Sequence, residues 1–345
     1  MIINGRPIGV DYPPFVIAEM SANHNGSLEK ALRLVEVAKN CGADAVKLQT
    51  YTPDTITLNL DTEDFRIRGG LWDGRTLYDL YEEAHMPWDW HKPLFERARS
   101  LDITIFSSPF DKTAVDLLED LNTPAYKIAS FEVIDLPLIK YAASTGKPLI
   151  ISTGMANELE IQEAIDAAQD GGCLELAVLH CISGYPAPAG DYNLRTIPDM
   201  MNRFGMVTGL SDHTLTNATA ITSIALGASI IEKHFTLDRK AGGPDDSFSL
   251  EPKDLKALCT DIQTAWHALG SIDYSKKSSE EDNLIFRRSL YFVKDMKEGE
   301  IITESSIRSV RPGFGLPPKA SNDLLGKSMV QAVSYGTAVK MEHFR

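Results

Sequence analysis

The sequence contains only four cysteines, has no CxxC pair and carries no excess of basic residues. Cys41, Cys173, Cys181 and Cys259 are scattered, which is typical of buried free thiols in a reducing cytoplasm and not of a disulfide framework. The formal net charge is −14, which argues against nucleic acid or an anionic membrane as a partner. An anionic substrate would therefore need local positive contacts, because the field of the whole protein repels it.

Long apolar runs are absent as well. No uninterrupted run is long enough to span a bilayer, and the first residues lack the basic region and apolar stretch of a secretory signal. Hydrophobic residues make up 43% of the chain and charged residues 24%, which is typical of a globular protein. We therefore expect a cytoplasmic protein, and its 345 residues fit one large domain plus one small one.

Eight short apolar runs recur along the first 240 residues. They are continuous rather than alternating, as expected of parallel strands that are buried on both faces. The runs are Phe15–Met20, Ala45–Thr50, Thr104–Pro109, Ala125–Ser130, Pro148–Thr153, Leu176–Cys181, Val207–His213 and Ile230–Thr236.

Helical patterns lie between these runs. Ser27 is a good N-cap before one helix, and Asn157 with Glu160 resembles a capping box before another. The other helical segments cover 93–101, 112–121, 136–144, 194–204, 217–227 and 253–269. Eight strands alternating with eight helices predict an α/β protein with a (β/α)8 TIM barrel. The rival is a doubly wound open sheet, which is disfavoured because no GxGxxG follows the first run.

One connection is abnormally long. From Tyr51 to about His91 the chain runs some forty residues between the second strand and its helix, far more than an ordinary βα loop. This excursion is rich in aromatic residues, has a turn at 69–74 and predicts a small helix at Leu77–Ala84. It is either a packed excursion or a wall over the active face, and we favour the wall because βα loops lie on the catalytic side of a barrel.

The composition changes after Gly270. Residues 271–286 are polar and charged and suggest a linker, and residues 287–345 show short strands separated by Gly and Pro turns. We expect a barrel domain over 1–270 and a small β-rich domain over 287–345. About sixty residues form a small core, so the second domain is expected to pack on something else.

Nearly every predicted strand ends in polar side chains, as expected of a catalytic barrel face. His213 and His234 follow adjacent strands at equivalent depths, where two imidazoles suit Mn, Fe, Co or Zn and leave positions open for water. From spacing alone, hydrogen bonding at the barrel rim is an equally supported interpretation. Glu19 follows an apolar run, and an isolated buried carboxylate is costly, so it should be paired or functional.

Two lysines and several serines at the strand ends predict a local anion pocket. Lysine charge and hydroxyl donors are what a phosphate or carboxylate needs in an otherwise acidic protein. The residues are Lys47, Ser108, Lys127, Ser130, Ser152 and Ser211. An alternative for Lys127 is a Schiff-base aldolase, which also places a lysine at a strand end.

The motifs IAEMSANHNGS, ADAVKLQTY, FSSPFD, YKIAS, ISTGM, LHCISGYPAP, GLSDHT, IEKHFTLDR and GGPDDSFS resemble the sialic acid synthase family. The tail with VRPGFG resembles its antifreeze-like (SAF) domain, so the resemblance covers almost the whole chain. Within the family, KLQTYTPDTIT and GLWDGRTLYDLYEEAHMPW look most like the pseudaminic acid synthases. Ser183 stands where the family usually has Asn, although a serine still offers a donor.

This resemblance implies a reaction and a role for each matching residue. The family condenses phosphoenolpyruvate with an open-chain amino sugar and water, which gives a nine-carbon 2-keto acid and phosphate. The resemblance implies that His213 and His234 hold a divalent metal, with Mn²⁺ expected in preference to Mg²⁺ or Co²⁺. Phosphoenolpyruvate would contact Lys47, Ser108, Lys127, Ser130, Ser152, Ser183 and Ser211. The sugar would contact Glu19, Gln49, Tyr185 and Asp245, with Glu19 also a candidate for proton or water handling.

The resemblance also implies a domain-swapped homodimer. Arg311 matches the arginine that reaches the sugar from the small domain of the partner subunit. The competing functions are a sialic or legionaminic acid synthase, a Schiff-base aldolase through Lys127, and a carbohydrate-binding protein without catalysis.

Overall fold

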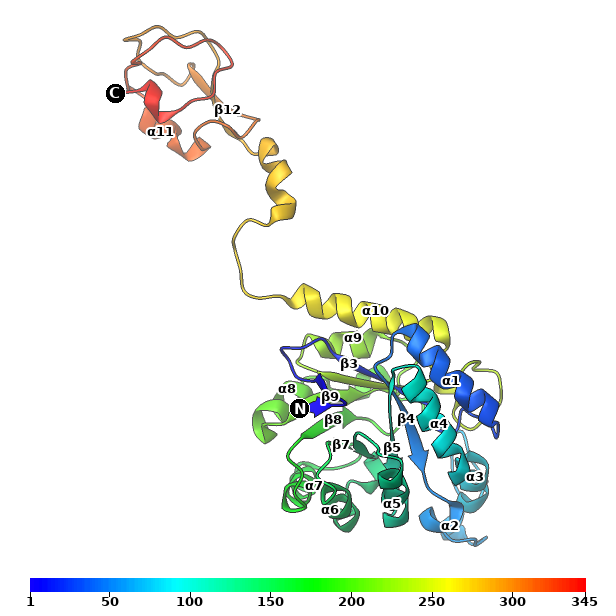
Figure 1. Ribbon diagram of the computed structural model, residues 1–345. Helices are drawn as coiled ribbons and strands as arrows, with labels where there is room; N and C mark the ends of the chain where they lie inside the picture. Colours follow the sequence, from blue (N-terminus) through cyan, green and yellow to red (C-terminus); the bar gives the residue numbers. More distant parts are fainter. The chain divides into compact units, whose positions relative to one another are not determined.

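The computed structural model describes residues 1–345 and divides into two compact units, Met1–Gly270 and Ser271–Arg345. Both units appear in Figure 1, where colour follows the sequence. No helix in either unit combines the length and the apolar character needed to cross a membrane.

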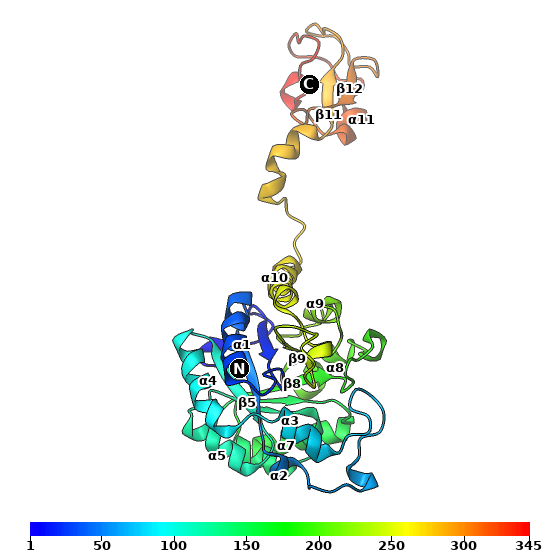
Figure 2. The same ribbon diagram turned by 90° about the vertical axis from the view of Figure 1, so that its right-hand side faces the viewer.

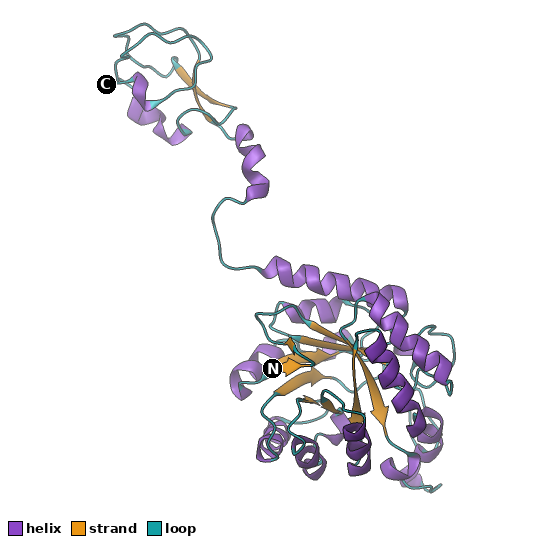
Figure 3. Ribbon diagram, in the orientation of Figure 1, coloured by secondary structure: helices purple, strands orange, loops and turns teal.

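Eight parallel strands of the first unit close into a barrel in the order β10-β3-β4-β5-β6-β7-β8-β9. Figure 3 shows these strands enclosed by helices, so the predicted TIM barrel is confirmed. The strands are β3 (Phe15–Glu19), β4 (Ala45–Thr50), β5 (Thr104–Pro109), β6 (Tyr126–Ile128), β7 (Leu149–Ser152), β8 (Leu176–Cys181), β9 (Val207–Ser211) and β10 (Ile230–His234). A two-stranded ribbon, β1 (Ile2–Ile3) and β2 (Arg6–Pro7), precedes the barrel.

Eight helices follow the eight strands. Neighbouring helices pack side by side, and α1 lies against both α4 and α10 (Figures 1 and 2). The helices are α1 (Leu28–Cys41), α4 (Trp88–Ser100), α5 (Lys112–Asp120), α6 (Leu136–Ala143), α7 (Glu158–Asp170), α8 (Thr196–Phe204), α9 (Ala218–Ile224) and α10 (Pro252–Leu269).

Local signals explain where the helices begin and end. The Ser27 hydroxyl accepts from the backbone of Lys30, and Gly42 ends α1 in the left-handed region at φ 94°. Asn157 and Glu160 form the predicted capping box of α7. The prediction was wrong for α4, which begins at Trp88 instead of residue 93, because Pro93 resembles a first-turn proline but lies inside the helix.

The excursion between β4 and α4 carries two short helices of its own. They are α2 (Pro53–Ile56) and α3 (Leu77–Ala84), the second as predicted, and the chain turns through Gly69 and Gly74 with positive φ between them. Figure 1 shows α2 and α3 beyond the tip of the β4 arrow, which is the C-terminal end of the barrel. The excursion is therefore on the side where a barrel places its active site.

The second unit has a small core of its own. Strands β11 (Ser289–Phe292) and β12 (Ile307–Val310) pair antiparallel, and α11 (Ser321–Leu324) follows. The remaining segments of this unit pair only through isolated bridges, such as Met296 with Val333. The core residues are Leu290, Phe292, Met296, Ile302, Ile307, Leu324, Met329 and Val339. Residues 271–286 are exposed, and Ser278–Phe286 form a 3-10 helix.

The four cysteines are free and buried, as the sequence indicates. Three of them lie in the barrel's outer hydrophobic layer, between strands and helices. The fourth, Cys181, ends β8 within the site described next.

Candidate active site at the C-terminal end of the barrel

The inside of the barrel changes from apolar to polar within one layer of side chains. Successive side chains that point into the barrel are two residues apart on a strand. Each strand therefore contributes one side chain to the lower layer and, two residues later, one to the layer above it. The lower layer includes Ile17, Ala45, Phe106, Ala125, Ile150, Leu179 and Ile230, which share one buried cluster. Two residues further along the same strands stand Glu19, Lys47, Ser108, Lys127, Ser152, Cys181 and Glu232, all buried. The chemistry of this unit is therefore concentrated at one end of the barrel.

Four charged side chains of this layer form a chain of ion pairs. Lys127 Nζ lies 3.1 Å from Glu232 Oε1, and Lys47 Nζ lies 3.5 Å from the same oxygen. Lys47 Nζ is also 2.9 Å from Glu19 Oε2. The two lysines of the predicted anion pocket are thus compensated by two carboxylates, as buried charges require.

Glu232 belongs to the polar strand ends of the sequence, but sequence reasoning assigned it no role in the site. Burial opposes its ionisation, but Lys127 and Lys47 outweigh burial and lower the pKa of this carboxyl to about 2. Ser211 Oγ donates to the same carboxylate at 3.3 Å. A signal was available, because Glu232 stands two residues before His234 and so shares its side of the strand.

Glu19 is held in a different electrostatic state. Burial raises its pKa to about 7, Lys47 acts in the opposite direction, and Glu232 adds to the rise. Gln49 Nε2 donates to Glu19 Oε1 at 2.9 Å and to Ser21 Oγ at 2.9 Å. The carboxyl is therefore divided between its two protonation states near neutral pH, which suits proton transfer.

The serines of the predicted anion pocket lie at the same end of the barrel as the lysines, and one of them contacts a lysine directly. Lys47 Nζ donates to Ser108 Oγ at 3.3 Å, and Ser130 Oγ accepts from the backbone of Gly154 at 3.1 Å. The hydroxyls of Ser152 and Ser183 are buried without any hydrogen-bond partner. A side chain at Gly154 would meet Ser183 Oγ at 2.1 Å, so this glycine keeps the space between the hydroxyls open. Unpaired buried donors at the end of the barrel that carries the two lysines can accommodate an oxyanion, and we call this group of lysines and serines the oxyanion cradle.

His213 and His234 lie together at the end of adjacent strands, with ring centroids 5.4 Å apart. The Nδ1 of His213 donates to the carbonyl of Ile182 at 2.8 Å. The Nδ1 of His234 is buried without a hydrogen bond and lies 3.8 Å from Asp245 Oδ2. Burial, then the charges of His213 and the lysines, lowers the pKa of His234 well below its usual value.

These two histidines fit a metal site with open positions. A neutral imidazole with an unpaired nitrogen, beside a second imidazole oriented by a backbone carbonyl, is the arrangement metal-binding histidines adopt. No three His, Cys, Asp or Glu side chains converge as a complete ligand set. Two protein ligands would leave the remaining coordination positions to water or substrate.

The residues predicted to meet the sugar lie next to the histidines. The Tyr185 ring centroid is 4.4 Å from that of His213 and 6.0 Å from that of His234. Asp245 Oδ2 accepts from Ser21 Oγ at 2.5 Å, and burial raises the Asp245 pKa. The Ser21 hydroxyl, which also accepts from Gln49 Nε2, therefore links Gln49 to Asp245 by hydrogen bonds. The sequence did not indicate this link.

Glu132 is a second carboxyl that the sequence did not single out. It lies in the turn after β6, and its Oε2 is buried without a hydrogen-bond partner. Burial is the main cause that raises its pKa to about 7, and the charges of Lys47 and Lys127 oppose the rise. No periodicity marks a residue in a short 3-10 turn, so only the structure brings it to the site.

Arg311 is the one predicted site residue outside the barrel unit. It follows β12 directly, is exposed, and precedes Pro312 through a cis peptide bond. Its proposed contact with sugar stays a prediction.

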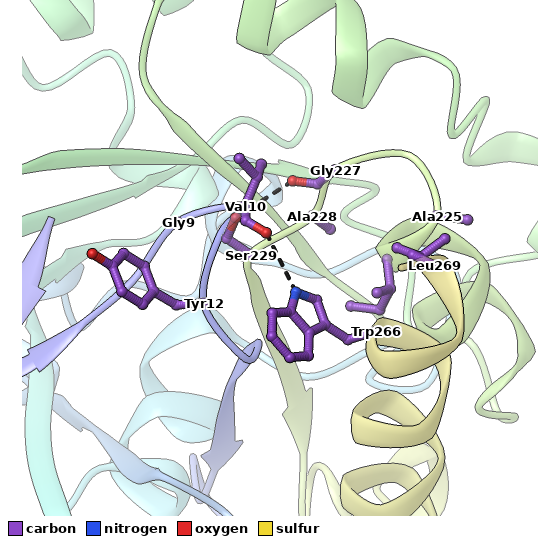
Figure 4. Close-up of a pocket in the computed structure, with 10 residues that line it drawn as sticks. Gly9, Val10, Tyr12, Ala225, Gly227, Ala228, Ser229, Trp266 and Leu269 are labelled. Atoms are coloured by element: carbon purple, nitrogen blue, oxygen red, sulfur yellow. Dashed lines mark hydrogen bonds between the residues drawn. The ribbon is translucent and has the colours of Figure 1, made fainter. Parts of the chain in front are cut away.

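A cavity of about 150 Å³ occupies the opposite end of the barrel and is separate from this site (Figure 4). It is lined by residues that precede β3 and β10 and by the end of α10, including Val10, Ser229 and Trp266. Trp266 Nε1 donates to the carbonyl of Val10 at 3.3 Å. None of the polar strand-end residues lines it.

Residues 34–274 match the NeuB family, and residues 287–345 match the SAF domain. The chain belongs to the NeuB family. It is 45% identical over 337 residues to a pseudaminic acid synthase from Campylobacter jejuni, covering 97% of this chain and 98% of that protein. It is 37% identical over 316 residues to an N,N'-diacetyllegionaminic acid synthase from the same species, covering 90% and 94%.

A solved structure supports the same assignment. The N-acetylneuraminic acid (sialic acid) synthetase from Leptospira borgpetersenii, in complex with citrate, matches with a TM-score of 0.73 and 30% identity. The match covers 82% of this chain and 94% of that one. The predicted family and barrel fold are thereby confirmed.

Proposed function

We propose that this chain is a pseudaminic acid synthase. It would condense phosphoenolpyruvate with a 2,4-diacetamido-2,4,6-trideoxy hexose of the altrose type and water, giving pseudaminate and phosphate. The observation that carries the proposal is the 45% identity over 97% of the chain to a protein of that name. The lower identity of 37% to a legionaminic acid synthase supports pseudaminate over legionaminate.

The oxyanion cradle is the proposed site for phosphoenolpyruvate. Lys47 and Lys127 supply the positive charge, and the unpaired hydroxyls of Ser152 and Ser183 supply donors. Ser108 contacts Lys47, Ser211 donates to the Glu232 carboxylate, and Ser130 accepts from the backbone of Gly154. The substrate would bring its own negative charge to a pocket in which Glu232 already neutralises part of the lysine charge.

The histidine pair is the proposed site for a divalent metal, with Mn²⁺ expected in preference to Mg²⁺ or Co²⁺. Bound there, the ion would supply Lewis acidity to the sugar aldehyde oxygen. His213 and His234 would hold it, and burial lowers the pKa of His234 and keeps that imidazole neutral. For His213, burial is outweighed by the contact with Cys181, which raises the pKa, so this imidazole would release a proton when the ion binds. Tyr185, Gln49 and Asp245 would orient the sugar beside the pair.

The two carboxyls with a pKa of about 7 are proposed to handle protons. C3 of the enol forms a bond to the aldehyde carbon, and the aldehyde oxygen becomes a hydroxyl with a proton from Glu19. Water adds to C2, and Glu132 takes the proton that this water loses. The bond from C2 to the phosphate oxygen then breaks, phosphate leaves with the remaining hydroxyl proton, and a ketone forms at C2.

We further infer a homodimer in which the small domain of one subunit completes the site of the other. The support is the family resemblance at Arg311 and the small core of the second unit, which holds eight buried hydrophobic residues. Arg311 of the partner subunit would contact the sugar. A cytoplasmic location stays a prediction.

A substrate panel tests the proposed function. The purified protein is mixed with phosphoenolpyruvate, Mn²⁺ and one of three sugars: the altrose-type diacetamido hexose, its legionaminate precursor, or N-acetylmannosamine. Phosphate release and the product mass are measured. We expect the highest kcat/KM for the altrose-type sugar, and preference for either other sugar would refute this assignment.

A Schiff-base aldolase through Lys127 is the second candidate, because burial lowers the pKa of that lysine. Its Nζ pairs with Glu232, however, and so is not a free amine. Borohydride with either substrate should leave the protein mass unchanged, and EDTA should abolish turnover. A trapped adduct on Lys127 would favour the aldolase.

A further inference from the structure

A second cavity, of about 200 Å³, opens beside the proposed sugar site. One wall is the excursion after β4, and the other is the loop between β10 and α10 that carries Asp245. The lining residues are Leu71, Trp72, Arg75, Glu83, Gly242, Gly243, Pro244 and Ser247.

Trp72 forms the border between this cavity and the site. Its Nε1 donates to the carbonyl of Pro244 at 3.1 Å, so the indole is fixed to the opposite wall. Its ring centroid is 5.9 Å from that of Tyr185, which in turn packs against His213. A sugar that starts at the histidine pair and passes Tyr185 therefore reaches Trp72 next.

The opposite wall is preformed. Asn25 Nδ2 and the backbone of Gly243 both donate to Asp246 Oδ2, each at 2.8 Å. A side chain at Gly243 would meet Asn25 Oδ1 at 2.1 Å, so the loop approaches Asn25 as closely as its backbone allows. Binding at this wall needs little rearrangement, which favours selectivity.

The lining is mostly polar, and it combines three apolar side chains with a neutralised charge pair. Leu71, Trp72 and Pro244 are apolar, and Arg75 Nη1 lies 2.7 Å from Glu83 Oε2. Because Glu83 compensates Arg75, the cavity does not select an anion. Its surface suits a neutral group that has both methyls and an amide.

We propose that this cavity receives the distal half of the amino sugar, the end away from the aldehyde, and that Trp72 selects for it. This inference rests on the proposed function, since the diacetamido trideoxy hexose carries an acetamido group and a terminal methyl at that end. The methyls would pack on the indole, and the amide would meet the Arg75–Glu83 pair. A sugar without the second acetamido group and the terminal methyl lacks these contacts with the indole and the ion pair, which lowers its kcat/KM.

The first test is a kinetic comparison of Trp72→Ala and Trp72→Phe with the parent enzyme. We expect Trp72→Ala to lower kcat/KM for the diacetamido sugar about 10- to 100-fold, with a smaller loss for Trp72→Phe. The KM for phosphoenolpyruvate should not change, and the preference over N-acetylmannosamine should shrink. Equal losses for both sugars, a parallel rise in the phosphoenolpyruvate KM, or no loss at all would overturn the proposal.

The second test measures binding without turnover. The alditol of the diacetamido sugar, which has no aldehyde, is titrated while tryptophan fluorescence is recorded. We expect quenching in the parent enzyme that is absent in Trp72→Phe and kept in Trp266→Phe, the matched control at the other end of the barrel. Undiminished quenching in Trp72→Phe would overturn the proposal.

The two hypotheses fail in different ways. If the parent enzyme prefers another sugar, the proposed function fails, and the Trp72 variants are then assayed with the preferred sugar. A selective change in that sugar's KM still supports a distal subsite, and an unchanged KM overturns it.

Discussion

Lys127 and Glu232 meet across the interior of the barrel, with Nζ 3.1 Å from Oε1. Their strands, β6 and β10, stand on opposite sides of the closed sheet. Lys47 on β4 shares the same carboxylate oxygen at 3.5 Å. The empty pocket is therefore close to charge balance, and an incoming anion must compete with Glu232 for both lysines.

Removing the Glu232 charge should destabilise the substrate-free protein. Glu232→Gln leaves Lys127 without a counter-ion and Lys47 with Glu19 alone, a loss of roughly 3–5 kcal/mol in the free energy of unfolding. Phosphoenolpyruvate should restore part of that loss, so its stabilising effect on Tm should be larger in the variant than in the parent. Glu158→Gln, in an exposed pair with Arg203, is the control and should change stability by about 1 kcal/mol or less. Equal ligand-induced shifts in parent and Glu232→Gln would contradict this account.

The pH dependence of kcat/KM should show the titration of Glu132. Its pKa is raised to about 7, so the carboxylate needed to accept a proton is lost as the pH falls below 7. We expect kcat/KM for phosphoenolpyruvate to rise from pH 6 to about 7, where Glu132 ionises, and to fall above 7, where Glu19 loses the proton that it must donate. Glu132→Gln should lower kcat about 10²- to 10⁴-fold and flatten the acidic limb, whereas Glu19→Gln should flatten the alkaline limb. Loss of the acidic limb in Glu19→Gln alone would identify Glu19 as the base.

The histidine pair should determine metal affinity. His234→Ala removes one of two proposed ligands, so Mn²⁺ binding followed by electron paramagnetic resonance should weaken strongly and turnover should be lost. His267→Ala, at an exposed position on α10, is the matched control and should bind Mn²⁺ as the parent does. Unchanged Mn²⁺ affinity in His234→Ala would rule out the assignment.

Lys233 should position His213 without touching a substrate. Its Nζ donates to Asp212 Oδ2 at 2.8 Å and to the carbonyls of Thr214 at 2.7 Å and Thr216 at 3.0 Å. Lys233→Met frees the loop that carries His213, so Mn²⁺ affinity should fall about 10- to 100-fold. Lys240→Met is the exposed control. A fall in Tm with unchanged Mn²⁺ affinity would mean that Lys233 serves the fold alone.

Combining two impaired variants in one dimer tests the shared active site. Arg311→Ala should raise the sugar KM while leaving that for phosphoenolpyruvate unchanged, and His234→Ala should be inactive. If the small domains are exchanged, co-expressed chains form mixed dimers with one intact site, which recovers about a quarter of the parent activity. A fully active monomer by light scattering, or no recovery on co-expression, would argue against exchange.

The strands and most helices were predictable because their signals are local. Three strands, β4, β5 and β8, have the predicted bounds, since each is a continuous apolar run with a clear polar end. The predicted start of α4 was wrong because proline is common in the first turn of a helix, and the sequence alone does not show that Pro93 lies inside this one. The segment around Val333 in the small unit forms only isolated bridges, because pairing there depends on distant residues.

By itself the sequence determined the barrel, the polar strand ends and the neighbouring places of His213 and His234. These follow from periods of two and of 3.6 residues and from strand order, which are local or topological properties. Only the tertiary structure decided that Glu232 pairs with Lys127 and Lys47, that Glu132 enters the site, and that Trp72 meets Pro244. Each of these relationships joins residues far apart in the chain, and their distances and burial depend on how the whole barrel closes.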